Sequence, residues 1–197
     1  MTRYSTILSF TLLALAASCS KEPSGAEYFA PPPEGERRTY DVTVAGPLTR
    51  QVKGVAIVSN RGEETVGDQT YWETVTTFDG IPGSRPETSW VRVGDDGVYS
   101  RKSTDPTAPE TLEWPLPPTV GRTWSSRQAE VDMKMTIAAM EDLDTAGKAY
   151  RNCLKVIGTG RKGTASLETT SYYAPDVGLV LTSTKGPGVV MEMRLRD

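Results

Sequence analysis

The stretch that decides the fold is Val131-Asp132-Met133-Lys134-Met135-Thr136-Ile137, in which every second residue is apolar. Successive side chains of a β-strand point to opposite faces of a sheet, so this alternation predicts a strand with one buried face. Residues 189–195 repeat the pattern near the C-terminus. From Tyr40 onward no segment shows the spacing of an amphipathic helix, whose apolar residues stand three and four positions apart. The sequence therefore predicts an all-β protein.

Short segments rich in Gly, Asn, Asp and Pro separate the alternating stretches. They include Ser59-Asn60-Arg61-Gly62, Gly94-Asp95-Asp96-Gly97, Thr145-Ala146-Gly147-Lys148, Pro175-Asp176-Val177-Gly178 and Lys185-Gly186-Pro187-Gly188. Such residues suit tight reversals, and their spacing predicts about nine or ten strands. We expect one domain over residues 39–197, an antiparallel meander. Because no predicted helix covers the sheet, the meander should form a curved sheet or a partly closed barrel.

One stretch breaks this pattern. Residues 104–123 contain Glu113-Trp114-Pro115-Leu116-Pro117-Pro118 together with further prolines and glycines. Proline cannot donate a hydrogen bond to a sheet ladder. We therefore interpret the whole stretch as a loop packed over the sheet.

Residues 1–18 have the order of a secretory signal peptide. A basic residue, Arg3, precedes an apolar stretch from Ile7 to Ala17 that is broken by Ser9 and Thr11. This stretch is shorter than the roughly 20 residues that cross a hydrocarbon core. Polar residues follow it at once, so we predict a removable signal rather than a permanent spanning helix.

The end of this stretch, Leu15-Ala16-Ala17-Ser18-Cys19, resembles the lipobox of bacterial lipoproteins. The resemblance implies cleavage before Cys19, lipidation of Cys19 and a membrane anchor made by its acyl chains. It departs from the usual pattern in that Ala16, rather than leucine, stands three residues before the cysteine. The alternative is an ordinary secretory signal with an incidental cysteine. In the lipoproteins it resembles, aspartate after the cysteine often signals inner-membrane retention, so Ser20 favours the outer membrane, facing the periplasm.

Residues 19–38 are expected to form the lipidated N-terminus and a spacer. The segment is rich in Pro, Gly and Glu, and Pro31-Pro32-Pro33 favours an extended, semi-rigid backbone. We therefore expect the β domain to begin at residue 39 and to be held clear of the lipid surface.

Charge patterning argues against a nucleic-acid partner. The chain has 22 basic and 25 acidic residues, and no basic run exceeds Arg37-Arg38 or Arg161-Lys162. Nucleic-acid binding needs a concentrated basic patch. The sequence therefore predicts no nucleic-acid partner.

The two cysteines have separate roles in this interpretation. With Cys19 acylated, Cys153 is the one remaining thiol, so no internal disulfide can form. Cys153 lies in an alternating segment, where a buried cysteine behaves as a small apolar residue. The alternative is a reactive or intermolecular thiol.

The chain contains no histidine, which removes the commonest general base and metal ligand and the usual Ser-His and Cys-His arrangements. Catalysis by carboxylates alone is the weakest hypothesis that is left. Its candidates are Asp95, Asp96, Asp142, Asp144, Glu73 and Glu168. Aspartates in turns commonly serve the turn itself. We therefore expect a protein that is not an enzyme and has no catalytic residue.

Two motifs imitate ligand sites. Asp142-Leu143-Asp144-Thr145-Ala146-Gly147 begins like a calcium loop, but Ala146 and Cys153 occupy its fifth and twelfth places, which leaves too few ligands. Gly158-Thr159-Gly160-Arg161-Lys162-Gly163 spells a dinucleotide-binding fingerprint, but a strand-like stretch follows where that motif needs a helix. We interpret both as hairpin turns and predict no metal and no cofactor.

Aromatic and methionine side chains are the remaining candidates for a site. Core packing is the expected use of most of them. The sharper alternative is a concave apolar surface for a lipid or other apolar ligand at the mouth of a half-open barrel, and methionine suits either role. The candidates for this surface are Trp72, Trp90, Trp114, Trp124, Met133 and Met135.

Two phrases resemble a family of envelope proteins. They are Trp114-Pro115-Leu116-Pro117-Pro118-Thr119-Val120-Gly121-Arg122-Thr123-Trp124 and Tyr172-Tyr173-Ala174-Pro175-Asp176-Val177-Gly178-Leu179-Val180. Together they are similar to the small lipoproteins called TapB-like, in which PL-x-VG-x-TW precedes the second half and YYAPGVGLV opens the last hairpin. Asp176 stands where glycine is common. The resemblance implies a curved antiparallel β domain and transfers no catalytic residue.

These inferences predict a non-enzymatic, membrane-anchored lipoprotein of the cell envelope that acts as a binding or interaction module. The alternative is a carrier of lipid or lipoprotein with an apolar cavity in a half-open barrel. The expected partners are the membrane, through the acyl chains on Cys19, and an envelope protein or an apolar small molecule.

Substitution Cys19→Ala tests the anchor. Wild-type protein extracted from membranes is expected to carry a lipid-sized mass increment that this variant lacks, because acylation requires the thiol of Cys19. Intact-mass spectrometry measures the increment, and Cys153→Ala, which leaves the lipobox intact, should retain it. An unmodified wild-type chain in the soluble fraction would instead identify a free periplasmic or secreted protein.

Overall fold

The computed structural model describes residues 24–46, 49–102, 107, 109–128 and 131–196. Its regular elements are η1 (Ala26–Tyr28), β1 (Arg37–Gly46), β2 (Thr49–Val66), β3 (Gln69–Asp79), β4 (Glu87–Val93), β5 (Gly97–Lys102), β6 (Thr111–Pro115), β7 (Thr123–Gln128), β8 (Val131–Thr145), β9 (Lys148–Lys162), β10 (Ala165–Ala174), β11 (Gly178–Gly186) and β12 (Val189–Leu195). The predicted all-β class is confirmed. Within the described ranges, no helix has the length and apolar character needed to span a membrane.

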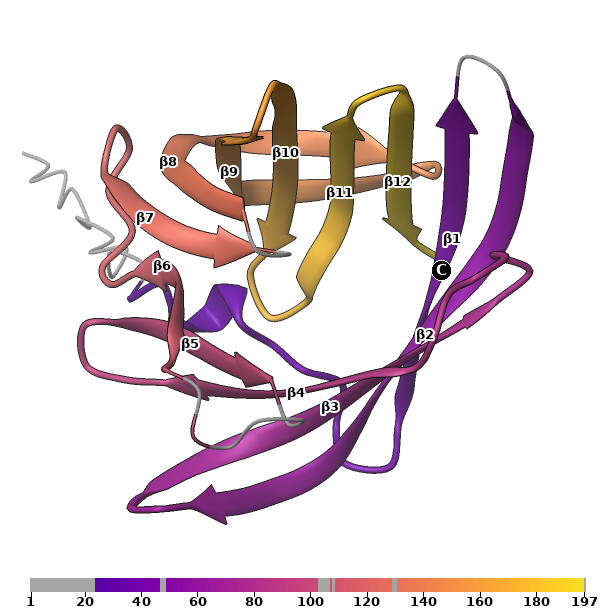
Figure 1. Cartoon of the computed structure of the whole chain (residues 1–197). Helices are drawn as coiled ribbons and strands as arrows, with labels where there is room; N and C mark the ends of the chain where they lie inside the picture. The colour runs from indigo at the N-terminus through magenta and orange to yellow at the C-terminus, as the bar shows by residue number, and fades with distance from the viewer. Residues whose placement is uncertain (1–23, 47–48, 103–106, 108, 129–130, 197) are drawn as a thin grey trace, which may run out of the picture.

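The strands form one 12-stranded antiparallel sheet with the order β6-β5-β4-β3-β2-β1-β12-β11-β10-β9-β8-β7. Strands β1 to β6 make one meander and β7 to β12 make another (Figure 1). The ladder between β1 and β12 joins them, with Tyr40 opposite Leu195 and Val44 opposite Met191. The predicted meander is therefore present as two halves that share a central ladder.

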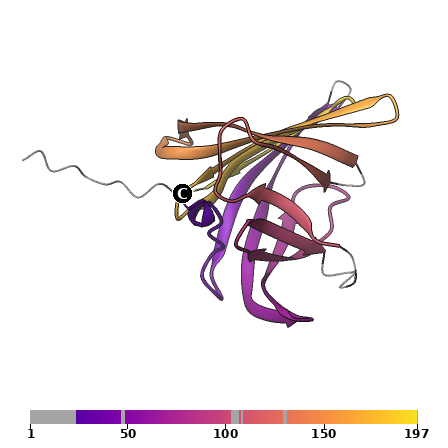
Figure 2. The same cartoon turned by 90° about the vertical axis from the view of Figure 1, so that its left-hand side faces the viewer.

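The sheet curls until its edge strands β6 and β7 approach each other (Figure 1). The indole Nε1 of Trp124 on β7 donates a hydrogen bond of 3.1 Å to the carbonyl oxygen of Leu112 on β6. Figure 2 shows the two halves of the sheet facing each other across the interior. The nearly closed, barrel-shaped sheet confirms the predicted curvature and buries its own concave face.

The structure has 12 strands, more than the sequence predicts. Part of the difference is β6, which lies in the stretch interpreted as a loop. Because β6 is an edge strand and Pro115 is its last residue, the missing N–H of the proline is tolerated. A proline at a strand end cannot be distinguished from a proline in a loop by sequence alone.

The alternating residues of β8 form the first of two apolar clusters. Val131, Met133, Met135 and Ile137 are each 6% exposed or less, whereas the charged residues between them are exposed. The other buried members of this cluster are Tyr28, Val98, Trp114, Leu154 and Val156. The second cluster comprises Tyr40, Val42, Ala56, Tyr150, Cys153, Ala174, Val180 and Leu195. The predicted buried face of β8 is therefore confirmed.

Cys153 is a free thiol that lies completely buried in the second cluster. Burial raises the pKa of this thiol, which keeps it protonated and poorly nucleophilic at neutral pH. The prediction of a buried, apolar cysteine is confirmed.

The motif that resembles a calcium loop is a hairpin turn, as predicted. Between β8 and β9 the chain reverses through Ala146 and Gly147, whose φ angles are 52° and 79°. Two successive positive φ angles are typical of the tight type I′ turn that joins antiparallel strands. The turn therefore accounts for the glycine of this motif.

Gly163 of the dinucleotide-like motif lies in the hairpin turn between β9 and β10, as predicted, with a φ of 62°. The other two glycines serve packing, which corrects their interpretation as loop residues. Gly158 and Gly160 lie inside β9, opposite Met135 and Met133 of β8. A Cβ at these glycines would lie 2.6 and 2.4 Å from the two methionine sulfurs. Glycine is therefore required in β9 because the methionine side chains lie across its backbone.

The N-terminal segment, residues 24–36, belongs to the domain, which corrects the predicted boundary at residue 39. Tyr28 has 0% of its surface exposed and packs in the first cluster. Gly25 lies so close to Pro118 that a Cβ would come within 2.3 Å of its ring. The Pro-rich composition concealed this packing, because a single large aromatic side chain can anchor an otherwise extended segment.

The hydroxyl of Tyr28 is fixed at an irregularity in β9. It donates to the carbonyl oxygen of Asn152 at 3.0 Å and accepts from the Asn152 Nδ2 at 3.2 Å. The backbone of Asn152 has a φ of 52°, and its N–H donates to Asp142 at 2.9 Å. Burial raises the pKa of Tyr28. The irregularity is a β-bulge, in which the register between β8 and β9 shifts between Glu141 and Leu143. It turns the carbonyl group of Asn152 toward the N-terminal segment.

Substitutions at Tyr28 test this anchor. Tyr28→Ala is expected to lower the free energy of unfolding by about 3–5 kcal/mol, because a large buried ring is removed. Tyr28→Phe keeps the ring and should cost roughly 1 kcal/mol for the lost hydrogen bonds. Chemical denaturation followed by tryptophan fluorescence measures both.

Tyr99→Phe is the matched control, because the hydroxyl of Tyr99 donates to Asp96 at the exposed surface. Its free energy of unfolding should stay within about 0.5 kcal/mol of wild type. Wild-type stability in Tyr28→Ala would show that the N-terminal segment does not stabilise the domain.

Candidate functional site

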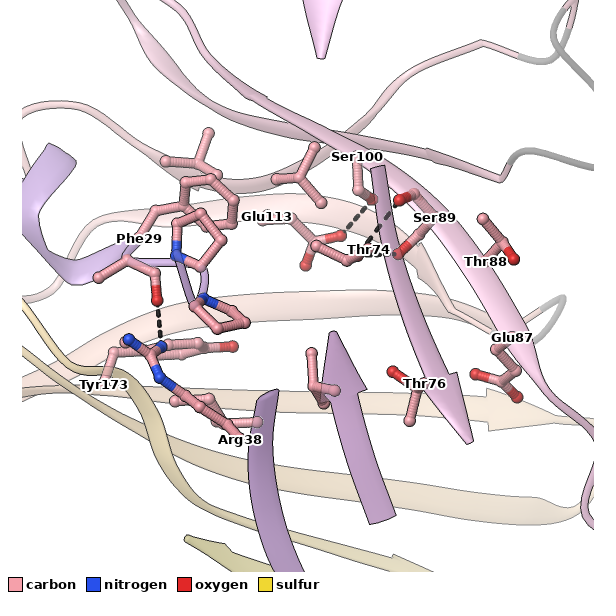
Figure 3. A pocket seen from close by; sticks show the side chains of 18 of the residues that line it. Phe29, Arg38, Thr74, Thr76, Glu87, Thr88, Ser89, Ser100, Glu113 and Tyr173 are labelled. Atoms are coloured by element: carbon pink, nitrogen blue, oxygen red, sulfur yellow. Dashed lines mark hydrogen bonds between the residues drawn. The ribbon is translucent and has the colours of Figure 1, made fainter. Parts of the chain in front are cut away.

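A cavity of about 740 Å³ lies inside the curl of the sheet. One side is formed by residues 28–32 of the N-terminal segment, and much of the other by strands β3 to β6 (Figure 3). Cavities that bind small organic molecules span roughly 300–1,000 Å³. The interior of the sheet is therefore large enough to hold a ligand.

A row of polar side chains lines the wall formed by β3 to β6. Its members are Thr74, Thr76, Ser89, Ser100, Thr111 and Glu113. The hydroxyls of Thr74 and Ser89 share a hydrogen bond of 3.0 Å, and Ser100 donates to the carboxylate of Glu113 (Figure 3). These bonds join side chains on neighbouring strands. The wall therefore presents an ordered set of oxygen atoms.

Glu113 reaches the cavity because β6 contains a bulge. Val98 on β5 pairs with Trp114, but the next residue, Tyr99, pairs with Leu112. Glu113 is the extra residue between them. In a regular strand, neighbouring side chains would point to opposite faces, whereas here both Glu113 and Trp114 line the cavity. The bulge therefore re-aims an acidic side chain into the interior.

The surroundings of Glu113 disfavour its charged form. Burial raises the pKa of this carboxyl group, and the hydrogen bond from Ser100 offsets only part of the effect. Burial also raises the pKa of Tyr173, with the charge of Glu113 as a smaller cause. Glu113 and Tyr173 therefore interact electrostatically within the same space.

Aromatic rings form the apolar part of the cavity. The rings of Trp114 and Tyr173 are in contact, with their centroids 4.7 Å apart and their planes tilted by 46°. Tyr28 and Phe29 contribute two further rings from the N-terminal segment. Phe29, Tyr173 and Glu113 all line this cavity (Figure 3). The site therefore combines a carboxyl group with several aromatic faces.

Three arginines and a second glutamate also line the cavity. They are Arg38, Arg101, Arg127 and Glu87. Arg38 donates a hydrogen bond to the carbonyl oxygen of Ala30 and so ties the N-terminal segment to β1 (Figure 3). Arg127 and Glu87 are exposed. Part of the lining is therefore charged and reaches solvent.

The structure distributes the predicted tryptophans over different surroundings. Trp114 lines the cavity. The ring centroid of Trp72 lies 5.7 Å from that of Phe29 in the N-terminal segment. Trp90 lies 6.3 Å from the ring of Tyr71, on the face opposite Ser89 and its cavity. Trp124 bridges β7 and β6. One of these four predicted residues therefore belongs to the cavity wall.

The predicted methionines serve the core. Met133 and Met135 are 1% and 4% exposed, and they cover the glycines of β9. Neither contributes to the lining of the cavity. The predicted lipidation site, Cys19, lies outside the described residues.

Sequence reasoning missed the polar side of the cavity. Thr74, Ser89 and Ser100 point inward, although alternation alone assigns polar residues to the solvent face. Glu113 stands in a Pro-rich stretch beside Trp114, and nothing in that stretch announces a bulge. Trp114, predicted as part of an apolar ligand surface, was the one signal in the sequence that pointed to this part of the cavity.

The turn aspartates of the carboxylate hypothesis lie away from the cavity. Asp95 and Asp96 are exposed between β4 and β5, and Asp142 and Asp144 are exposed on β8. Backbone and side-chain hydrogen bonds from residues 151–152 hold the pKa of Asp142 below its usual range. No group of three or more candidate metal ligands occurs among the described residues. These aspartates therefore stabilise or terminate hairpins.

A second polar cluster lies on the opposite face of β3 and β4. Arg92 donates two hydrogen bonds of 2.6 Å to the carboxylate of Glu110, which also accepts one of 2.6 Å from the hydroxyl of Tyr71. The Arg92 guanidinium holds the pKa of Glu110 below its usual range. The charges are mutually satisfied, so the cluster fastens the segment before β6 to the sheet.

A solved structure shares this architecture. The chain is similar to the crystal structure of a Bacteroides fragilis protein described as a "putative exported protein with YmcC-like fold", with a TM-score of 0.55 and 13% identity. The similarity covers 85% of this chain and 96% of that one. The chain therefore has a fold of this kind, an antiparallel sheet curled around its own interior.

Sequence comparisons give no further assignment. No protein-family model matches the chain, and no curated protein matches it. The resemblance to TapB-like lipoproteins is therefore not confirmed.

Substitution Glu113→Gln is expected to change how stability depends on pH. Because burial raises the pKa of Glu113 in the folded protein, the wild type loses free energy of unfolding as the pH rises through that pKa. Glutamine cannot ionise and can still accept from Ser100. At neutral pH the free energy of unfolding of the variant should exceed that of wild type, by about 1.4 kcal/mol for each tenfold difference in the ionisation constant of Glu113 between the folded and unfolded protein. In acid this difference should disappear, because Glu113 is then protonated in both states.

Denaturant unfolding at a series of pH values measures the difference. Glu168→Gln, at an exposed position of β10, is the control and should keep the wild-type pH profile. Identical profiles for wild type and Glu113→Gln would show that Glu113 ionises as easily in the folded protein as in the unfolded chain.

Proposed function

We propose that this protein is a lipid-anchored envelope protein that binds a small, partly apolar molecule inside its curled sheet. The observation that carries the proposal is the cavity of about 740 Å³, lined by aromatic rings on one part and by hydroxyl and carboxyl groups on another. Such a combination of apolar area with a few placed polar groups is typical of small-molecule sites. It favours the carrier form of the hypothesis over a module that acts only through its outer surface.

The anchor belongs to this proposal and rests on the lipobox-like sequence before Cys19. Because Gly25 is already buried in the domain, residues 20–24 would be the tether between an acylated Cys19 and the folded protein. Fully extended, that tether spans at most about 22 Å. An acylated Cys19 would therefore hold the cavity close to the membrane surface instead of far above it.

Binding without catalysis is the second part of the proposal. It is supported by the absence of histidine from the sequence. Carboxylate catalysis generally needs two carboxyl groups at a defined spacing. Glu113 instead accepts a hydrogen bond from Ser100, and Glu87, the other glutamate of the cavity, is exposed to solvent. In a binding protein, the polar groups on β3 to β6 would form hydrogen bonds to the ligand and would not take part in a reaction.

Filling the cavity tests the proposal. Thr76 lines the cavity from β3, whereas its neighbour Thr77 is exposed on the other face. Native mass spectrometry of protein released from membranes without organic extraction should show a small-molecule adduct in wild type and in Thr77→Trp. In Thr76→Trp the adduct should fall about tenfold, because the indole occupies the space of the ligand.

A bare protein mass in repeated wild-type preparations would contradict the proposal. Equal adduct in Thr76→Trp and Thr77→Trp would place the bound molecule outside the cavity. Turnover of a substrate that disappears in Glu113→Gln would replace the binding role with an enzymatic one.

A further inference from the structure

We infer that the cavity selects a molecule with a basic amine, whose ammonium group lies against Glu113 and whose apolar part lies among the aromatic rings. The inference rests on the proposed function, since it names the class of ligand for the same cavity. It is carried by the juxtaposition of a bulged carboxyl group, Trp114 and Tyr173.

Glu113 accepts fewer hydrogen bonds from the described residues than a carboxylate can take. The carboxylate accepts one from the hydroxyl of Ser100, whereas an ionised carboxylate has room for about four. Glu113 is nevertheless turned into the cavity by the bulge of β6. Removing a carboxyl group from water is costly unless a donor or a cation compensates. A ligand with an ammonium group would supply both.

Two aromatic rings, those of Trp114 and Tyr173, line the cavity together with this carboxyl group. Trp114 follows Glu113 on the same strand, and its ring contacts that of Tyr173 at 4.7 Å. Glu113 and Tyr173 line the same cavity. Aromatic faces attract cations, especially where water is excluded. A carboxylate beside two rings is therefore a favourable environment for an organic ammonium group.

Three arginines and a second glutamate are the other charged groups that line the cavity. Arg38 donates to the carbonyl oxygen of Ala30, and Arg101 and Arg127 line other parts of the wall together with Glu87. Among the described residues, Glu113 accepts a hydrogen bond from Ser100 and forms no ion pair with these arginines. An anionic ligand at Glu113 would place two like charges together, which disfavours a carboxylate at this point.

The remaining lining fits the rest of such a molecule. The hydroxyls of Thr74 and Ser89 form a short row near Glu113 and bond to each other. Tyr28, Phe29 and Leu179 supply apolar surface. A short alkyl or aryl group attached to the amine would occupy this space, with the cavity volume of about 740 Å³ leaving room for a larger natural ligand.

Three probes of matched shape test the inference. Hexylamine, 1-hexanol and hexanoate differ only in the charge and hydrogen bonding of one end. They would be titrated calorimetrically into the full chain purified from membranes and reconstituted in lipid nanodiscs, with empty nanodiscs as the blank. Hexylamine should bind roughly tenfold to a hundredfold more tightly than 1-hexanol, the range expected of a charge-assisted hydrogen bond, and hexanoate should bind least.

Glu113→Gln should abolish the preference for hexylamine over 1-hexanol, because glutamine carries no charge to pair with the ammonium group. Glu168→Gln, which removes an exposed carboxylate on β10, should keep the wild-type preference. Wild-type protein provides a second readout that needs no substitution. Its affinity for hexylamine should fall as the pH is lowered through the raised pKa of Glu113, because protons compete for the carboxylate while the amine stays charged.

The outcomes separate the inference from the proposed function. Binding of 1-hexanol without preference for hexylamine, or a preference that survives in Glu113→Gln, would overturn the amine assignment and leave a ligand-binding cavity in place. Tighter binding of hexanoate would assign the site to anions and would point to the arginines instead. Failure of all three probes to bind would overturn both.

Discussion

The constraint on which the structure depends is that one continuous sheet has to bury its own apolar face. The described part of the chain offers no long helix as a cover, so the sheet curls and its two halves face each other. The ladder between β1 and β12 joins the halves on one side, and Trp124 bridges β7 and β6 on the other. Curling protects the sheet edges and encloses space that side chains fill only in part.

The N-terminal segment completes this interior. Tyr28 enters the first apolar cluster, and Arg38 holds the backbone at Ala30. The same segment forms one side of the cavity, so the chain that leads from the proposed anchor also shapes the proposed binding site. If Cys19 is acylated as proposed, a ligand in the cavity would lie within a short tether of a lipid surface.

Glu113 shows how a local irregularity gives a uniform architecture a distinct chemistry. A regular β6 would point either Glu113 or Trp114 into the cavity, but the bulge presents both. Burying the carboxyl group opposes folding at neutral pH, and nothing in the architecture of the sheet requires an acid there. Buried groups that cost stability in this way commonly serve a ligand, which is the reason for placing the site here.

The sequence by itself determined most of the strands, most of their turns and the buried face of β8. It could do so because alternation and turn chemistry are local properties, as Met133, Met135 and the Ala146-Gly147 turn show. Tertiary structure alone decided that Tyr28 belongs to the core, that β6 is a strand and that Glu113 faces the cavity. These features depend on contacts between residues far apart in the chain and on one extra residue in a ladder, and neither leaves a periodic signal in the sequence.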